Sequence, residues 1–225
     1  MKRLYIVRHA TAQSKDGPVP DFERSLTKKG EKEAKTAARH LALKYPSPDL
    51  MISSFANRAI ETAHIFAETF GYPPRKILLR DSFYGDLSPD AILKVITAKP
   101  DKYQSLMIFG HDPAFSELAA RLIEGFEAAI PKSGVVIADF PVEKWSEIVK
   151  VPGRLVEYTH PARIKEDRKK ARGELDARLV RSMMGVLSRI DKTAAQSVGE
   201  DIRDCSRKIV KSFLKARKAV DRPET

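Results

Sequence analysis

Short apolar runs alternate with stretches of helical spacing along the first 160 residues of the chain. Runs rich in β-branched and aromatic residues predict buried strands, and apolar residues three or four positions apart predict helices. The expected strands are 4–7, 49–54, 77–79, 106–109, 135–137 and a late one in the region 148–156, with a turn at Pro152-Gly153. The expected helices follow Thr27, cover 57–70, follow Ser88 and cover 113–123. Strand and helix therefore alternate at short spacing.

This alternation predicts βαβ units and a mostly parallel sheet with helices on both faces, which is a three-layer α/β sandwich. Thr27 and Ser88 are residues of the type that caps a helix amino terminus, and Pro89 suits the first helical turn. Gly71 is placed to end the helix 57–70. Phosphate chemistry is common on such sheets, but a fold of this kind does not specify a function.

The pattern changes to helix alone from residue 162. One apolar face is formed by Leu175, Leu179, Met183, Val186 or Leu187, and Ile190, and a second by Val198, Ile202, Cys205, Ile209 and Phe213. The two stretches are separated by a break around 191–199, so an antiparallel helical hairpin is expected. The sequence thus predicts a main domain over 1–161 and a helical extension over 162–225.

Composition restricts the class of protein. Apolar residues make up 42% of the 225 positions and charged residues 32%, as in a globular chain. We find no apolar stretch near the length of about 20 residues that spans a membrane, and the start of the chain does not resemble a signal peptide. The single cysteine, Cys205, excludes an intrachain disulfide and a cysteine metal site. A reducing cytoplasm is the expected location.

Positive charge is concentrated in the extension. Residues 161–225 carry 18 Lys and Arg against 10 Asp and Glu, a net charge of +8 out of +11 for the chain. We favour a solvated face on a hairpin whose apolar stripe packs against the main domain or a second subunit. The alternative is a platform for a polyanion or an acidic partner. Phe213 is the only aromatic residue there, which argues against base stacking on a nucleic acid.

Three strand ends carry a cation or an imidazole. Arg8 and His9 follow the first strand, Arg58 lies in the first turn after the second, and His111 follows the fourth directly after Gly110. The carboxyl ends of parallel strands meet at one edge of a sheet, where ligands bind. An arginine fork matches a phosphoryl group, and helix amino termini add oriented N–H groups. Taken singly, each residue has an ordinary structural explanation; together they predict an anion site.

Five segments in a fixed order resemble one known family. They are "LYIVRHATA", "DFERSLTKKGEKEA", "PDLMISSFANRAIETA", "SFYGDLSPDAILKVI" and "MIFGHDPAFSELAARL". The chain is similar to the histidine phosphatase superfamily, which has the phosphoglycerate-mutase-like fold, and within it to the small SixA-type phosphohistidine phosphatases. The resemblance covers residues 1–160 and does not extend to the helical extension.

The resemblance implies a mechanism and assigns roles to residues. His9 would be the nucleophile, forming a phosphohistidine intermediate that water hydrolyses. Arg8 and Arg58 would hold the phosphoryl oxygens and His111 would donate a further hydrogen bond, without a metal or another cofactor. Attack requires a neutral imidazole. One ring nitrogen of His9 should therefore donate to a carbonyl, and nearby cations should lower its pKa below the usual value of about 6.5.

The general acid is left open. Larger relatives place a glutamate after the third strand; Asp81 occupies that place here and Asp86 is a second choice, while SixA-type members often lack the group. A phosphohistidine protonated on its distal nitrogen leaves as neutral imidazole and needs no strong acid. We therefore expect a metal-independent phosphatase for phosphohistidine in a phosphorelay-type protein. The alternatives are a phosphomonoesterase for small molecules, and a phospholigand- or polyanion-binding protein with the extension as its interaction module.

Overall fold

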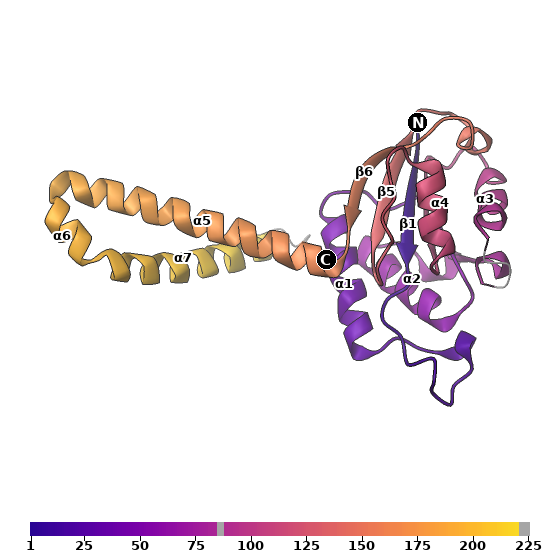
Figure 1. The fold of residues 1–225 in the computed structure, drawn as a ribbon, viewed down its shortest axis with the longest axis horizontal. Helices are drawn as coiled ribbons and strands as arrows, with labels where there is room; N and C mark the ends of the chain where they lie inside the picture. The colour runs from indigo at the N-terminus through magenta and orange to yellow at the C-terminus, as the bar shows by residue number, and fades with distance from the viewer. Residues whose placement is uncertain (85–87, 221–225) are drawn as a thin grey trace. The chain divides into compact units, whose positions relative to one another are not determined.

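The computed structural model describes residues 1–84 and 88–220, and the chain divides into two compact units, Met1–Ile164 and Lys165–Thr225. The first unit contains a six-stranded sheet with the strand order β3-β2-β4-β1-β5-β6. Figure 1 shows β1, β5 and β6 side by side in this sheet. The strands are β1 Lys2–Arg8, β2 Leu50–Ser53, β3 Leu78–Leu79, β4 Ser105–Gly110, β5 Val135–Phe140 and β6 Arg154–Thr159. The first four are parallel to one another, and β5 and β6 are antiparallel to their neighbours.

Helices cover both faces of this sheet. Two hydrophobic cores form, because alternate residues of a strand point to opposite faces. Leu4 and Ile6 of β1 belong to the core under α3 (Pro89–Thr97) and α4 (Ala114–Leu122). Tyr5 and Val7 belong to the core under α1 (Lys28–Ala42) and α2 (Asn57–Phe70). The predicted three-layer sandwich with a mostly parallel sheet is confirmed.

Local signals fix the helix ends. The Thr27 hydroxyl accepts a hydrogen bond from the Gly30 amide at 3.1 Å, and the Ser88 hydroxyl accepts one from the Ala91 amide at 3.2 Å. Gly71 ends α2 in a left-handed conformation with φ 67°, which glycine adopts without steric cost. All three sequence predictions of these ends are confirmed.

The last strand begins later than the sequence predicts. The sequence places a strand in the region 148–156, whereas β6 starts at Arg154, after the predicted turn, and Trp145–Glu147 forms one turn of 3₁₀ helix. Trp145 is fully buried and its indole N–H donates to the Tyr103 carbonyl at 2.9 Å, which holds the chain away from the sheet. A Cβ on Gly153 would meet the ring of Phe140 at 2.6 Å, so the turn packs tightly against β5. Pairing with β5 therefore begins only at Arg154.

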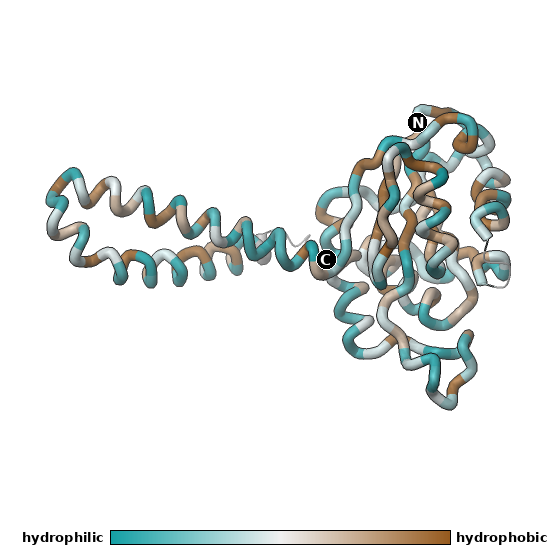
Figure 2. Tube along the Cα trace, in the orientation of Figure 1, coloured by the Kyte–Doolittle hydropathy of each residue, from teal (hydrophilic) through white to brown (hydrophobic). Residues whose placement is uncertain are grey.

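The second unit is helical, as predicted. Its elements are the greater part of α5 (Pro161–Ile190), α6 (Lys192–Ser197) and α7 (Gly199–Val220) (Figure 1). The short α6 occupies the predicted break. Figure 2 shows the strands of the sheet as largely apolar and the two long helices as mainly hydrophilic with scattered apolar positions. Among the described residues, no helix combines the length and the apolar character needed to cross a membrane.

The side of α7 that is buried within the second unit includes a polar residue. Ile202, Ser206 and Val210 are at most 5% exposed, and the Ser206 hydroxyl donates to the Asp176 carboxylate of α5 at 2.5 Å. Ile209 and Phe213, which belong to the predicted apolar face, are 45% and 54% exposed. A polar residue, Ser206, therefore forms a contact between the two helices, which an apolar periodicity does not reveal.

Candidate active site

The carboxyl ends of three neighbouring strands, β2, β4 and β1, bring the predicted residues together. Arg8 lies opposite Gly110 in the β1–β4 register, and the His9 amide donates to the Gly110 carbonyl at 3.0 Å. His111 follows Gly110, and Arg58 lies in the first turn of α2 after β2. All four predicted residues line one cavity of about 740 Å³. The expected convergence at one edge of the sheet is therefore present.

His9 is held as a neutral imidazole with a defined tautomer. Its side chain is almost fully buried, and its Nδ1 lies 2.7 Å from the carbonyl oxygen of Ala10. A carbonyl only accepts, so Nδ1 carries the proton and Nε2 keeps its lone pair. Burial lowers the pKa of His9 to about 3, and the charges of Arg58 and Arg8 act in the same direction. The structure therefore shows both features expected of His9: a ring N–H that donates to a carbonyl, and a lowered pKa.

The loop that carries this carbonyl is fixed by the start of α1. The Thr11 carbonyl accepts from the amide of Thr27 at 3.0 Å and from its hydroxyl at 3.1 Å. Gly30 packs directly against the same peptide, since a Cβ there would lie 2.0 Å from the Thr11 oxygen. The Ala10 amide donates to the Thr62 hydroxyl of α2 at 3.0 Å. Two helices therefore hold the acceptor of His9 in place.

His111 lies beside His9 with a ring-centroid separation of 5.0 Å. Its Nε2 is 3.0 Å from the hydroxyl oxygen of Ser54, the residue that follows β2. Its Nδ1 is buried and has no hydrogen-bond partner among the described residues. Burial lowers the pKa of His111 to about 2, with further contributions from His9 and Arg58. His111 is neutral and presents one unpaired ring nitrogen.

The two arginines are partly paired. Arg8 Nη1 donates to the Ile130 carbonyl at 2.7 Å and lies 3.5 Å from a carboxylate oxygen of Asp112. Arg58 donates through Nη1 to the Asp21 carbonyl at 2.5 Å and through Nη2 to the Asp21 carboxylate at 2.9 Å. The Nε atoms of both arginines are buried without a partner among the described residues. Buried polar atoms are rarely left unpaired, so these nitrogens and Nδ1 of His111 indicate a site for an oxyanion.

Asp81, the first candidate for the general acid, does not line this cavity. Asp81 begins a 3₁₀ turn, Asp81–Phe83; it is exposed and does not line the cavity, so the structure does not bring it together with His9. Asp86 lies outside the described residues. The aspartate that pairs with Arg58 in the cavity is Asp21, in the loop before α1.

Sequence reasoning missed Asp21 as a site residue. The signal was available in the segment "DFERSLTKKGEKEA", where an aspartate and an arginine stand three residues apart before a predicted helix. Arg24 is 5% exposed and donates to the Asp21 carboxylate through Nη2 at 2.5 Å. A buried arginine in a polar loop generally requires such a carboxylate partner.

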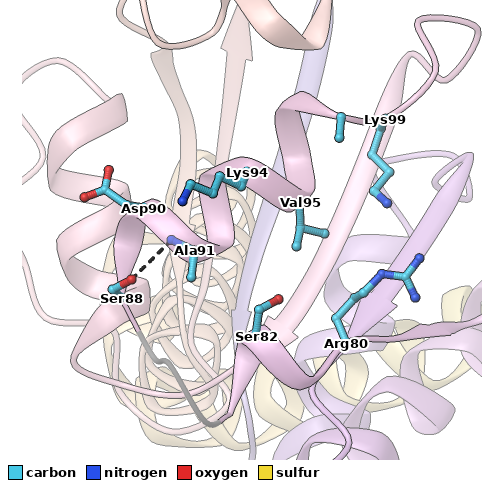
Figure 3. Close-up of a pocket in the computed structure, with 9 residues that line it drawn as sticks. Arg80, Ser82, Ser88, Asp90, Ala91, Lys94, Val95 and Lys99 are labelled. Carbon is cyan, nitrogen blue, oxygen red and sulfur yellow. Dashed lines mark hydrogen bonds between the residues drawn. The ribbon is translucent and has the colours of Figure 1, made fainter.

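A second hollow, of about 610 Å³, lies beside α3 (Figure 3). Arg80, Lys94 and Lys99 line it, and burial together with the charge of Arg80 lowers the pKa of Lys99. The Ser88 hydroxyl in this hollow accepts a hydrogen bond from the Ala91 amide and caps α3, so it already has a structural partner. None of the four predicted site residues lines this hollow.

In the part of the chain that the structure describes, no three His, Cys, Asp or Glu side chains are grouped to hold a metal ion.

Fold and site define an α/β protein that presents cations and a neutral histidine pair at the carboxyl edge of its sheet. Residues 4–136 match the model of the histidine phosphatase superfamily (branch 1), and the chain belongs to this superfamily. A phosphatase activity that depends on a histidine follows from that membership.

The chain is also similar to two uncharacterised proteins. An uncharacterised protein of Mycobacterium tuberculosis is 31% identical over 141 residues, which cover 58% of this chain and 85% of the relative. A chloroplastic protein of Arabidopsis thaliana, also uncharacterised, is 28% identical over 160 residues, which cover 68% of this chain and 72% of the relative.

Solved structures share the fold. A SixA-type candidate phosphohistidine phosphatase from Agrobacterium tumefaciens has a TM-score of 0.59 and 28% identity, over 71% of this chain and 98% of that one. A corresponding protein from Nakamurella multipartitia has a TM-score of 0.61 and 22% identity, over 71% and 96%. The protein histidine phosphatase SixA in complex with tungstate has a TM-score of 0.58 and 19% identity, over 71% and 97%.

Proposed function

We propose that this protein is a metal-independent phosphatase that removes the phosphoryl group from phosphohistidine in a partner protein of the phosphorelay type. Residues 1–161 would form the catalytic domain and 162–225 a separate extension, and the cytoplasm is the proposed location. One observation carries the proposal. The cavity combines a neutral His9, whose Nε2 is unprotonated, with three buried nitrogens that lack partners among the described residues: Nε of Arg8, Nε of Arg58 and Nδ1 of His111.

The chemistry follows from these atoms. Nε of Arg8, Nε of Arg58 and Nδ1 of His111 would donate to the oxygens of a bound phosphoryl group. The lone pair on Nε2 of His9 would attack phosphorus and form a P–N bond while the bond to the leaving group breaks on the opposite side. Water would then cleave the phosphohistidine and release inorganic phosphate. Because the site is buried, fixed donors stabilise the phosphoryl charge better than they would in water.

The choice of substrate rests on the leaving group. Hydrogen bonds and positive charge around Asp21 hold its pKa below the usual range, against the effect of burial, so its carboxylate is ionised. An ionised carboxylate does not protonate an alkoxide. A phosphohistidine whose distal ring nitrogen is protonated leaves as neutral imidazole without such a donor. The 28% identity to the SixA-type protein of Agrobacterium tumefaciens supports the same substrate class.

A panel of substrates tests the proposal. The full-length protein would be assayed with a phosphohistidine peptide, an aryl phosphate and a sugar phosphate, with and without a chelator. We expect the highest kcat/KM on the peptide, no effect of the chelator, and a loss of about a thousandfold or more in the His9→Ala variant.

His64→Ala is the matched control, because His64 lies on α2 but is exposed and outside the cavity lining. Full activity in His9→Ala would remove His9 from the mechanism, and inactivation by the chelator would contradict metal independence. A small phosphate ester as the best substrate would favour the second candidate, a phosphomonoesterase. The cavity gives that candidate some support, because Lys15 and Lys132 line it and could hold an acidic ester.

A further inference from the structure

Asp21 is the most heavily hydrogen-bonded carboxylate of the described cavity lining. One of its oxygens accepts from Arg58 Nη2 and from the Tyr84 hydroxyl, both at 2.9 Å. The other accepts from Arg24 Nη2 at 2.5 Å and Nε at 3.0 Å. Four donors therefore hold a negative charge in a fixed position, immediately beside an arginine that the proposed function assigns to the phosphoryl group.

Burial places this carboxylate between the floor and the opening of the cavity. His9, His111 and Arg58 are at most 8% exposed and form the floor, whereas the side chain of Asp21 is 45% exposed. Tyr84 contacts both Asp21 and the floor: its hydroxyl binds Asp21, and its ring centroid lies 5.6 Å from that of His111 and 5.8 Å from Cζ of Arg58. A leaving group on a phosphoryl held at the floor points away from His9, because attack is in line. It therefore points toward the opening, where Asp21 lies.

A fixed negative charge at that place affects different substrates in opposite ways. The leaving oxygen of a phosphate ester develops negative charge and carries no proton, so a carboxylate, which only accepts hydrogen bonds, cannot stabilise it. A phosphoramidate with a protonated imidazole carries an N–H and a positive charge on its leaving group. The same carboxylate would accept that N–H in a charge-assisted hydrogen bond. A carboxylate at this place, which accepts hydrogen bonds and donates none, thus discriminates between the two classes.

We propose that Asp21 determines specificity, with its carboxylate accepting a hydrogen bond from the protonated distal ring nitrogen of a phosphohistidine leaving group in place of the one from the Tyr84 hydroxyl. The inference rests on the proposed function and names a determinant of its substrate class. As Nε2 of His9 forms its bond to phosphorus, the substrate P–N bond breaks and its electron pair passes to the proximal ring nitrogen. The distal N–H stays on the ring, which departs as neutral imidazole.

The ratio of two activities separates this role from a purely structural one. Asp21 also orients Arg58, so its replacement can lower the turnover of every substrate. A loss of orientation alone would reduce activity on N-phosphoimidazole and on p-nitrophenyl phosphate by the same factor. A loss of the hydrogen bond to the leaving group would reduce only the first, since p-nitrophenolate needs no proton to leave.

The test is kcat/KM on these two probes for the wild type, Asp21→Asn and Asp21→Glu. In Asp21→Asn the ratio of N-phosphoimidazole to p-nitrophenyl phosphate should fall about 10- to 100-fold, the range expected for a lost hydrogen bond to a charged group. Asp21→Glu keeps the charge and should keep most of the preference. Asp16→Asn is the matched control; Asp16 lines the same cavity, is exposed and has no ion pair among the described residues, so the ratio should not change.

An unchanged ratio in Asp21→Asn, with a wild type that hydrolyses both probes through His9, would overturn this inference and leave the proposed function intact. Failure of the wild type to hydrolyse either probe, or full activity in His9→Ala, would instead refute the proposed function. If Asp21→Asn does not fold, as judged by its circular dichroism, Asp21→Ser takes its place. The ratio should then be high in Asp21→Glu and Asp16→Asn, which keep a carboxylate at position 21, and low in Asp21→Ser. An equal ratio in all three variants would overturn the inference.

Discussion

Nδ1 of His9 lies 2.7 Å from the carbonyl oxygen of Ala10, its neighbour in the chain. The backbone itself thus sets the tautomer of the histidine and leaves Nε2 as the nucleophilic atom. Since that carbonyl belongs to a loop anchored on α1 and α2, the reactivity of His9 depends on residues far from the phosphoryl site. Five predictions follow from this and related contacts.

The first prediction concerns the protonation of His9. Because burial lowers its pKa to about 3, its imidazole stays neutral when the pH falls from about 7.5 to about 5, whereas an unperturbed histidine titrates near 6.5. The C2–H resonance of His9, assigned from the His9→Asn spectrum, should not shift over this range. In urea the same resonance should titrate near the reference value. A midpoint near 6.5 in the folded protein would contradict the structure.

The second prediction concerns stability in acid. His9 and His111 have folded pKa values of about 3 and about 2, below the unfolded value, so the unfolded chain binds more protons as the pH falls below about 6.5. Their contribution to stability is complete above that pH and is lost progressively toward pH 3. Each group should lower the free energy of unfolding by about 1.4 kcal/mol per pH unit within this window.

Urea unfolding at several pH values measures this effect. The His111→Asn variant lacks one of the two groups, so its free energy of unfolding should fall less steeply with acid than that of the wild type. Equal slopes in the two proteins would mean that His111 binds a proton in the folded state near its ordinary pKa.

The third prediction concerns Gly30. A methyl group in Gly30→Ala would lie 2.0 Å from the Thr11 oxygen, so the loop carrying the Ala10 carbonyl has to move. Overpacking of this kind typically costs about 1–3 kcal/mol, and kcat/KM should fall together with the melting temperature. Gly173→Ala is the control, since nothing lies within 4 Å of its added Cβ in α5. Wild-type activity and stability in Gly30→Ala would show that the loop is not held by this contact.

The fourth prediction concerns Ser54 and the tautomer of His111. If the Ser54 hydroxyl donates to Nε2, His111 carries its proton on Nδ1 and can donate it to a phosphoryl oxygen. The ¹⁵N spectrum of the wild type should show the Nδ1–H tautomer of His111, and Ser54→Ala should lose this preference and about tenfold in kcat/KM. Ser53→Ala is the control, because that buried hydroxyl donates to the Ser54 carbonyl and not to His111. A wild-type His111 protonated on Nε2 would exclude this role.

The fifth prediction concerns the extension. Every described residue that lines the site cavity precedes residue 133, and Ile164 is the last core residue of the first unit. Truncation after Ile164 should therefore leave kcat/KM on an aryl phosphate within about twofold of the full chain, as for a domain with its own core. Retention on immobilised heparin would be measured in parallel. Unchanged retention would remove the extension as a polyanion-binding element, and loss of activity would make it part of the catalytic unit.

Much of the first unit could be predicted from local sequence signals. Leu4, Tyr5, Ile6 and Val7 are all apolar, which predicts a strand buried on both faces. The structure confirms this, because Leu4 and Ile6 lie in one core and Tyr5 and Val7 in the other. Helix caps such as Thr27 depend only on a few neighbouring residues. The meeting of Arg8, His9, Arg58 and His111 was also predictable, because parallel strands bring their carboxyl ends to the same edge.

Other features depended on contacts between distant parts of the chain. The family resemblance gave Asp81 as the first candidate for the acid, but Asp81 does not line the cavity, whereas the path of the loop before α1 brings Asp21 into it. The burial of Ser206 in the hairpin follows from its bond to Asp176, thirty residues earlier in the chain.

The amino-acid sequence alone specifies the order of strands and helices, the histidine and arginine set at the strand ends, and the basic character of the extension. These properties follow from periodicity, capping and composition, which act over a few residues. Only the folded structure shows that Asp21 pairs with Arg58, that Nδ1 of His9 carries the proton, and that Ser206 of α7 contacts α5. Each of these depends on how loops and helices pack over long separations, and local periodicity carries no information about such packing.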